Sequence, residues 1–175
     1  MKASVFVGIS VDGFMARKNG GIDFLPTDCE PHGFDEFYAS VDAMVIGRRT
    51  FEWVVDYGGW AYGEKMRVVV LSSKPLDLSV ARGRGGKVEQ MAGDPVDIVE
   101  KLEASGVQHA YVDGGVTIQR FLRAGLIQRL TITRVPVLIG EGIPLFGPLG
   151  EDIKLRLVSA QSYPGGLAKA EYEVA

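Results

Sequence analysis

Short apolar runs that end at glycine or at polar residues alternate along this chain with segments of helical periodicity. Strands are predicted at the runs 3–9, 43–46, 67–71, 88–91 and 110–112. The run 67–71 is β-branched, with three valines in a row, as is typical of a strand. A helix is clearest after Asp94, which suits the N-cap, with Pro95 at the first helical position and Gly106 at the end. Because alternating strands and helices need crossover connections, the sequence predicts an α/β fold with a mainly parallel sheet.

The last part of the chain follows a different pattern. Residues 155–163 and 169–174 predict an antiparallel pair of strands at an edge of the sheet, joined by Pro164-Gly165-Gly166. The polar segment 77–86 is rich in glycine and arginine and is predicted to be a loop. The chain has 175 residues, and neither a linker nor a break in composition divides it. We therefore expect a single α/β domain over residues 1–175.

Composition excludes several functional classes. Lys and Arg number 19 and Asp and Glu number 22, a net charge of −3, whereas a general nucleic-acid binder needs a dense cationic surface. The single cysteine, Cys29, cannot form an internal disulfide or a cysteine zinc cage. No run of about 18 apolar residues is present to span a membrane, and the N-terminal apolar run reaches polar Ser10 too soon for a signal peptide. We expect a cytoplasmic protein with no nucleic-acid or membrane partner. We expect no metal, since the acidic segment 23–36 is typical of a solvated loop.

Residues suited to binding phosphate follow three of the predicted strands. The segments are Gly47-Arg48-Arg49-Thr50, Ser72-Ser73-Lys74 and Asp113-Gly114-Gly115-Val116-Thr117. Ligands of open α/β sheets bind beyond the carboxyl ends of the strands, so these segments are expected to share one rim. A Gly-Gly turn before a helix exposes backbone N–H groups at the positive end of the helix dipole, and basic and hydroxyl side chains add further donors. Each segment alone is also typical of a tight turn or a solvated surface pair. Together they predict a site for a nucleotide with several phosphates, including a 2′-phosphate.

The same segments carry a resemblance to a known family. Residues 45–52 resemble the Gly-Arg-x-Thr-aromatic-Glu segment of dihydrofolate reductase, and residues 70–75 are similar to its Leu-Ser-Ser-x-Pro segment. Residues 112–115 resemble its Gly-Gly turn and occur in the same order. Within that superfamily, residues 10–13 and 136–142 look more like the riboflavin-biosynthesis reductase branch. The resemblance covers nearly the whole chain.

The resemblance implies a dihydrofolate reductase-like three-layer sandwich that binds NADPH, with the cofactor-binding residues in three groups. The adenosine end and its 2′-phosphate would contact Arg48, Arg49, Ser72, Ser73 and Lys74. The pyrophosphate would lie against Thr50 and the backbone of Gly114, Gly115, Val116 and Thr117, and the nicotinamide against Gly8, Met15 and Ala16. Gly47, Leu71 and Asp113 complete the expected set.

The substrate side of the site is also implied by the resemblance. Dihydrofolate reductases use a carboxylate of the first helix to bind the pterin and assist protonation. Asp28 matches that position, and Asp35, on a predicted helix, is the competing catalytic residue; the riboflavin branch requires no such carboxylate. Phe24, Phe34 and Phe37 are candidates for an aromatic wall that binds the substrate, and ordinary core packing is the alternative for each.

The expected function is transfer of a hydride from NADPH to a C=N or C=O bond of a small heterocyclic substrate. The resemblance implies a substrate of the pterin or folate type, or of the ribosylamino-pyrimidine type. The alternative is a nucleotide-binding module of the same fold without turnover. Riboflavin-type members are usually dimers, and the final strands, with Val158, Tyr163, Tyr172 and Val174, would pair across a two-fold axis. A homodimer is therefore the expected assembly.

Overall fold

The computed structural model describes residues 1–27 and 32–175. The first half contains β1 (Lys2–Ser10), β2 (Phe14–Ala16), α1 (Phe34–Ala39), β3 (Ala43–Gly47), α2 (Arg48–Gly58), β4 (Arg67–Leu71), α3 (Ser79–Gly83) and β5 (Lys87–Met91). The second half contains α4 (Pro95–Ala104), β6 (His109–Asp113), α5 (Gly115–Arg123), β7 (Arg129–Val135), β8 (Ile143–Pro144), β9 (Leu155–Ser162), the 3-10 helix η1 (Pro164–Gly166) and β10 (Ala168–Val174). Each strand named above as predicted is present, and β2 and β8 are short strands that the sequence did not indicate.

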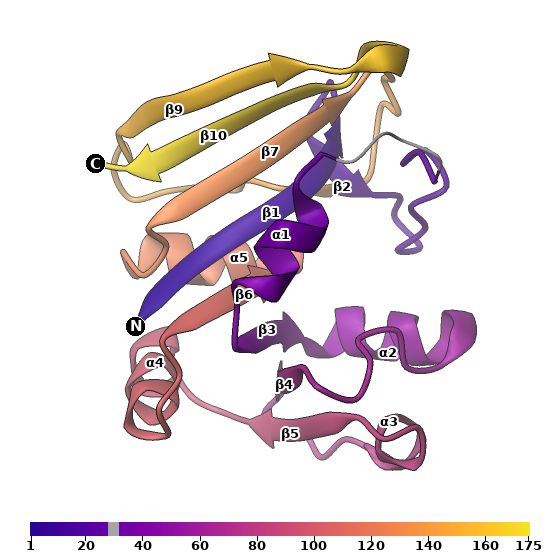
Figure 1. Cartoon of the computed structure of the whole chain (residues 1–175), viewed down its shortest axis with the longest axis vertical. Helices are drawn as coiled ribbons and strands as arrows, with labels where there is room; N and C mark the ends of the chain where they lie inside the picture. The colour runs from indigo at the N-terminus through magenta and orange to yellow at the C-terminus, as the bar shows by residue number, and fades with distance from the viewer. Residues whose placement is uncertain (28–31) are drawn as a thin grey trace.

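One eight-stranded sheet organises the described chain, with the strand order β5-β4-β3-β6-β1-β7-β10-β9 (Figure 1). Strand β10 runs antiparallel to its neighbours β7 and β9, and the other neighbouring pairs in this sheet are parallel. Strands β2 and β8 form a separate two-stranded sheet. The prediction of an α/β fold with a mainly parallel sheet and antiparallel C-terminal strands is confirmed.

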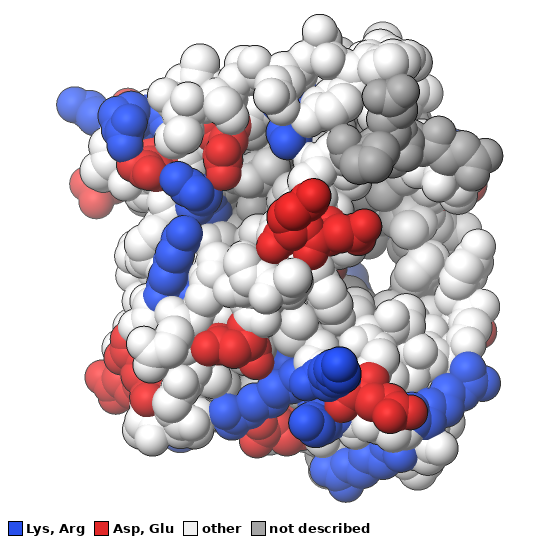
Figure 2. All heavy atoms as spheres, viewed as in Figure 1, with Lys and Arg blue, Asp and Glu red and all other residues white. Residues whose placement is uncertain are grey.

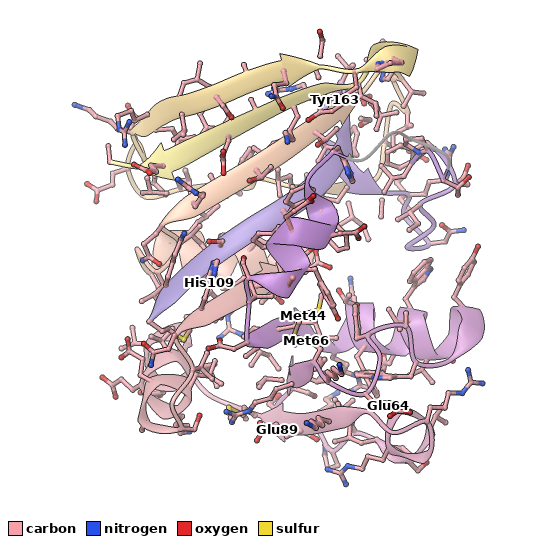
Figure 3. The ribbon with its side chains drawn as sticks, in the orientation of Figure 1. Met44, Glu64, Met66, Glu89, His109 and Tyr163 are labelled. Carbon is pink, nitrogen blue, oxygen red and sulfur yellow. The ribbon has the colours of Figure 1, made fainter. Side chains whose placement is uncertain are left out.

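A hydrophobic core lies on each face of the sheet, which gives three layers. Helices α4 and α5 cover one face, where Leu102 and Phe121 are fully buried. Helices α1, α2 and α3 cover the other face, and the side chains of Met44 and Met66 lie in that core (Figure 3). Full burial of a Leu, Phe or Met side chain stabilises a fold by roughly 1.5–3 kcal/mol. The helices are therefore fixed to the sheet mainly through these apolar stripes.

The segment 77–86 is not a loop throughout, and that prediction is wrong for its central part. Residues Ser79–Gly83 form the helix α3. Leu78 and Ala81 are buried in the core beneath it, and the carboxylate of Asp77 accepts the backbone N–H of Ser79 at 2.9 Å. Tertiary burial of two apolar side chains thus outweighs the polar composition of the segment.

Two features are absent from residues 1–27 and 32–175. None of the helices there has the length and apolar character needed to cross a membrane. In the same residues, no three His, Cys, Asp or Glu side chains are grouped so as to hold a metal ion.

The register of the parallel strands brings four strand ends to one edge of the sheet. Gly47 of β3 is paired with Leu71 of β4, and Leu71 with Met91 of β5. On the other side of β3, Ile46 is paired with Asp113 of β6. The three segments that the sequence singled out therefore begin side by side, and the end of β5 joins them.

Candidate functional site

A cavity of about 470 Å³ opens at the carboxyl ends of β4 and β5. It is lined by Arg48, Leu71, Ser72, Ser73, Lys74, Met91, Ala92, Gly93 and Arg120. Three cationic side chains thus share one hollow with two hydroxyl groups. The first five of these residues were predicted from the sequence to bind a cofactor. Arg49 is exposed on α2 and does not line the cavity.

Four cavity residues were missed by sequence reasoning: Met91, Ala92, Gly93 and Arg120. The first three follow strand β5, so the rule that ligands bind beyond strand ends would have found them had it been applied to that strand. Arg120 gives no such signal. It lies in the second turn of α5, and only the rotation of that helix turns its side chain toward the cavity.

A rigid turn follows strand β4. The Ser72 hydroxyl donates to the Lys74 carbonyl at 2.7 Å and accepts the Lys74 backbone N–H at 3.2 Å. The side-chain amide of Gln90 donates to the carbonyls of Ser72 and Lys74, both at 2.9 Å. Because Ser72 uses its hydroxyl hydrogen within the turn, Ser73 and Lys74 are the residues that offer donors to a ligand there.

Arg48 is the first residue of α2 and is held by an ion pair within that helix. Its Nε lies 2.6 Å from Oε1 of Glu52, four residues later, and both side chains are about two-fifths exposed. Among the described residues no acceptor contacts its two terminal amino groups, which therefore remain available to an anion. The pair fixes the direction of the guanidinium on the cavity wall.

The N-termini of α2 and α5 lie beside one another at the carboxyl ends of β3 and β6, and we call the place where they meet the crevice. Their N-cap residues are Gly47 and Gly114, and neither helix has a side-chain cap. A Cβ on Gly114 would lie 2.7 Å from the Thr50 hydroxyl oxygen, and a Cβ on Gly47 would lie 2.8 Å from that of Thr117. Each threonine therefore contacts the glycine of the opposite helix. No further side chain fits beside these glycines, and the two positive helix ends meet here.

The carboxyl group of Asp113 lies inside this edge, surrounded by protein, although the residue as a whole is half-buried. Its Oδ1 accepts the backbone N–H of Gly114 at 2.8 Å, which holds the Gly-Gly turn. Burial raises the pKa of Asp113, against the opposing effect of that hydrogen bond. Burial, and secondly the charge of Asp113, raise the pKa values of the Tyr62 and Tyr111 phenols. Asp113 is thus a carboxyl group that binds protons more readily than usual.

The three residues predicted to contact the nicotinamide each have different neighbours in the structure. Met15 lies against the Gly-Gly turn, because a Cβ on Gly115 would be 3.5 Å from its sulfur. Gly8 instead contacts the side chain of Leu25, which would lie 3.0 Å from an added Cβ. Ala16 is buried in β2. Val116, further along α5, has an exposed side chain.

The predicted substrate residues have packing roles in this structure. The rings of Phe34 and Phe37 lie 5.4 and 5.2 Å from that of Phe6, and both pack against the core under α1. The ring of Phe24 is half-buried, with the guanidinium of Arg17 5.9 Å from its centroid. Asp35 is exposed on α1. Asp28 lies outside the described residues.

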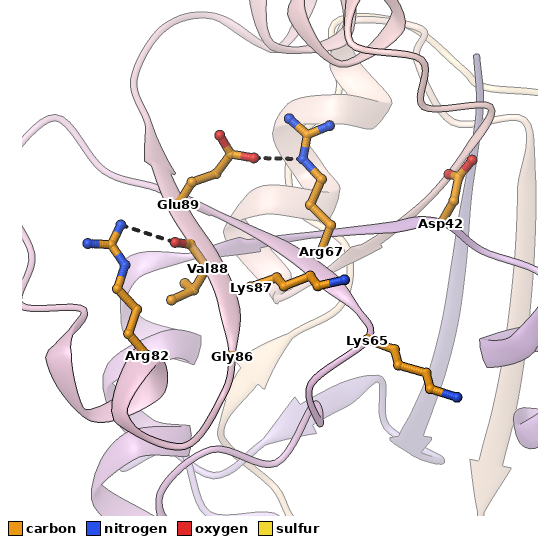
Figure 4. Close-up of a pocket in the computed structure, with 8 residues that line it drawn as sticks. All are labelled: Asp42, Lys65, Arg67, Arg82, Gly86, Lys87, Val88 and Glu89. Carbon is orange, nitrogen blue, oxygen red and sulfur yellow. Dashed lines mark hydrogen bonds and ion pairs between the residues drawn. The ribbon is translucent and has the colours of Figure 1, made fainter.

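A second cavity, of about 710 Å³, lies at the opposite edge, by the amino ends of β4 and β5 (Figure 4). Lys and Arg side chains mixed with acidic ones gather over this part of the molecule (Figure 2). The charges serve local contacts: Arg67 pairs with Glu89 at 2.6 Å, Arg82 donates to the Val88 carbonyl, and Asp42 accepts two backbone N–H groups. We therefore take the carboxyl edge as the functional one, as the parallel sheet requires.

Known proteins show the same architecture. The RibD C-terminal domain family matches residues 2–169. A crystal structure from Shewanella sp. PV-4, with a provisional riboflavin biosynthesis assignment, is 34% identical with a TM-score of 0.89, covering 100% of this chain and 99% of that one. The uncharacterized protein YwjB of Bacillus subtilis strain 168 is 29% identical over 173 residues, covering 93% of this chain and 92% of YwjB.

A more distant structure extends the likeness in fold. Dihydrofolate reductase from Enterococcus faecalis, solved with NADP(H), has a TM-score of 0.69 at 15% identity, covering 99% of this chain and 96% of the enzyme. Both levels of the resemblance seen in the sequence are thereby confirmed. The fold is dihydrofolate reductase-like, and the chain belongs to the RibD C-terminal domain family.

Proposed function

We propose that this chain is an NADPH-dependent reductase that transfers a hydride to a C=N or C=O bond of a small pterin-like or ribosylamino-pyrimidine heterocycle. The reductase type of fold is supported by family membership. The observation that carries the cofactor assignment is the crevice between α2 and α5, where Thr50 and Thr117 each contact the opposite glycine. Beside it lies a cavity with three cationic side chains.

The residues present fit such a cofactor. The crevice excludes side chains and offers helix N-termini with two hydroxyl groups, which is the chemistry that a pyrophosphate needs. Arg48, Ser73 and Lys74 offer a fork of amino groups, a hydroxyl and an ammonium to the adenosine phosphate. The nicotinamide of the bound cofactor supplies the hydride. The chain would hold the pyrophosphate and the adenosine phosphate, and these two contacts would orient the nicotinamide ring toward the substrate.

Proton delivery in this proposal does not rest on a helix carboxylate. Asp35 is exposed on α1, as the riboflavin branch permits. Alignment of two bound reactants contributes roughly 7–11 kcal/mol to lowering a barrier. Water is therefore the proposed proton source.

Calorimetry and a turnover assay test the proposal together. We expect heat on titration with NADPH, and loss of NADPH absorbance on addition of a pterin or an aminopyrimidine. Binding without turnover of any such heterocycle would instead support the nucleotide-binding module. Absence of heat with both NADPH and NADP⁺ at about millimolar concentration, where even weak sites are occupied, would refute the cofactor site.

We also propose that two copies pair through strand β9, in the cytoplasm. This strand is the outer edge of the sheet, and Leu155 and Leu157 are 41% and 56% exposed. Tyr172 and Val174, which the sequence had offered as dimer residues, pack against the core instead. An open apolar edge strand favours pairing with another strand. Sedimentation should show a dimer that Leu157→Lys disrupts and that Leu138→Lys, at a position after β7 that is 71% exposed, leaves intact.

A further inference from the structure

Arg120 is the cationic residue of the cavity that neither the phosphate-binding segments nor the family resemblance indicated. Its side chain is 38% exposed and lines the cavity together with Arg48 and Lys74. One terminal amino group donates to the carbonyl of Gly93 at 3.1 Å and lies 3.9 Å from a carboxylate oxygen of Asp94. Arg120 thus connects α5 to the loop between β5 and α4, across the floor of the cavity.

The loop holds Arg120 without using up its charge. Gly93 has φ +141°, a conformation that favours glycine, so the direction of its carbonyl is set by the backbone. Asp94 is 88% exposed, and an ion pair with such a solvated carboxylate is weak. A guanidinium has five N–H donors, and the Gly93 carbonyl takes one of them. The remaining donors are available on the cavity side.

The spacing along α5 separates Arg120 from the crevice. It lies five residues after Gly115, which is about 7.5 Å along the axis of a helix. A ligand that binds both the helix N-terminus and Arg120 therefore carries two anionic groups separated by several ångströms. The cavity at Arg120 brings three cations to the second group, while the pairing of Arg48 with Glu52 offsets one of them.

We infer that Arg120 is a specificity-determining residue that contacts the ribose 2′-phosphate and favours NADPH over NADH. This inference rests on the proposed function and adds to the cofactor site a residue one turn further along α5. Loss of a charged hydrogen bond to phosphate weakens binding by about ten-fold or more. NADH lacks the phosphate, so its affinity should not depend on this contact. Stacking of the guanidinium on the adenine ring would affect both dinucleotides equally.

Calorimetry of Arg120→Met with NADPH, NADH and adenosine 2′,5′-bisphosphate tests the inference. We expect NADPH and the bisphosphate to bind about ten-fold more weakly or worse, and NADH within about two-fold of the wild-type chain. Arg120→Lys keeps the charge and should retain part of the NADPH preference. Arg123→Met is the matched control on the same helix, because Arg123 contacts the Pro148 carbonyl and not the cavity. Its binding of all three ligands should match the wild type.

The outcomes separate this inference from the proposed function. Equal losses for NADPH and NADH in Arg120→Met would assign the residue to the adenine ring and overturn the inference. Unchanged NADPH affinity in a variant as stable as Arg123→Met would overturn it as well, while the proposed function would stand. A wild-type chain that binds none of the three ligands would overturn both.

Discussion

Substituting Gly114 by alanine tests whether the crevice between α2 and α5 is the phosphate site. Gly114 has φ +94° and ψ 129°, and an added Cβ would lie 2.7 Å from the Thr50 hydroxyl oxygen. Backbone strain of this kind costs roughly 1–3 kcal/mol, and displacement of Thr50 adds to it. Because 1 kcal/mol shifts the Tm of a chain this size by roughly 2–4 °C, we expect a fall of about 4 °C or more.

The same methyl group should also obstruct the pyrophosphate. Because the pyrophosphate would then lose its contact with the helix N–H groups, NADPH should bind about ten-fold more weakly or worse. Gly106→Ala is the matched control, because Gly106 has φ +93° and nothing lies within 4 Å of an added Cβ. That variant should lose some stability through strain alone and bind NADPH like the wild type.

Adding Thr50→Ala to Gly114→Ala completes the test. Removal of the contacted oxygen should restore part of the Tm, whereas NADPH affinity should stay low, because the methyl group remains. The reasoning is refuted if Gly114→Ala binds NADPH as the wild type does and loses no more stability than Gly106→Ala. Phosphate would then bind elsewhere.

Three further predictions concern charged groups. Arg48→Ala should weaken NADPH binding by about ten-fold or more and change NADH binding little. Glu52→Gln frees Arg48 from its 2.6 Å ion pair and should tighten NADPH binding about two-fold. Calorimetry that finds equal changes for NADPH and NADH would contradict this prediction. Burial raises the pKa of Asp113, so its ionised form is unfavourable in the folded chain and lowers stability at pH values above the ordinary pKa of 3.8. In Asp113→Asn the amide oxygen still accepts the Gly114 N–H, so the Tm at neutral pH should rise. A lower Tm would show that the charge stabilises the turn. Burial lowers the pKa of His109, whose ring forms hydrogen bonds with the Ser4 hydroxyl at 2.8 Å and the Ser40 carbonyl at 3.1 Å. Stability should therefore fall as the pH drops below about 6.5, and urea titrations should show a smaller fall for His109→Gln. An equal fall in the variant would assign the pH dependence to other groups.

Strand positions and strand ends were predictable because they depend on local patterns. The β-branched run around Val69 predicted a strand over 67–71, and β4 spans those residues. Gly114 takes a positive φ directly after β6, as the Gly-Gly turn suggested. Such features follow from periodicity and backbone freedom, and neither requires knowledge of which strands are neighbours.

The missed features depend on packing between distant segments. Helix α3 exists because Leu78 and Ala81 meet the core, although their neighbours are polar. Arg120 reaches the cavity because the carbonyl of Gly93, 27 residues earlier, accepts one of its hydrogens. Phe37 packs against Tyr111 at 5.0 Å between ring centroids, a contact between residues 74 positions apart. Sequence spacing carries no information on these contacts.

Strand order explains why the crevice lies where it does. Strands β3 and β6 are neighbours, although Ala43 and Ala110 of their first register pair lie 67 positions apart in the sequence. The helices that follow the two strands leave toward opposite faces. Helix α2 contributes Phe51 to one core, and α5 contributes Phe121 to the other. A sheet opens a crevice where successive connections diverge in this way, and here its two walls begin with Gly47 and Gly114. The sequence could name both glycines as ends of strands, but only the order of the strands makes them opposite walls of one site.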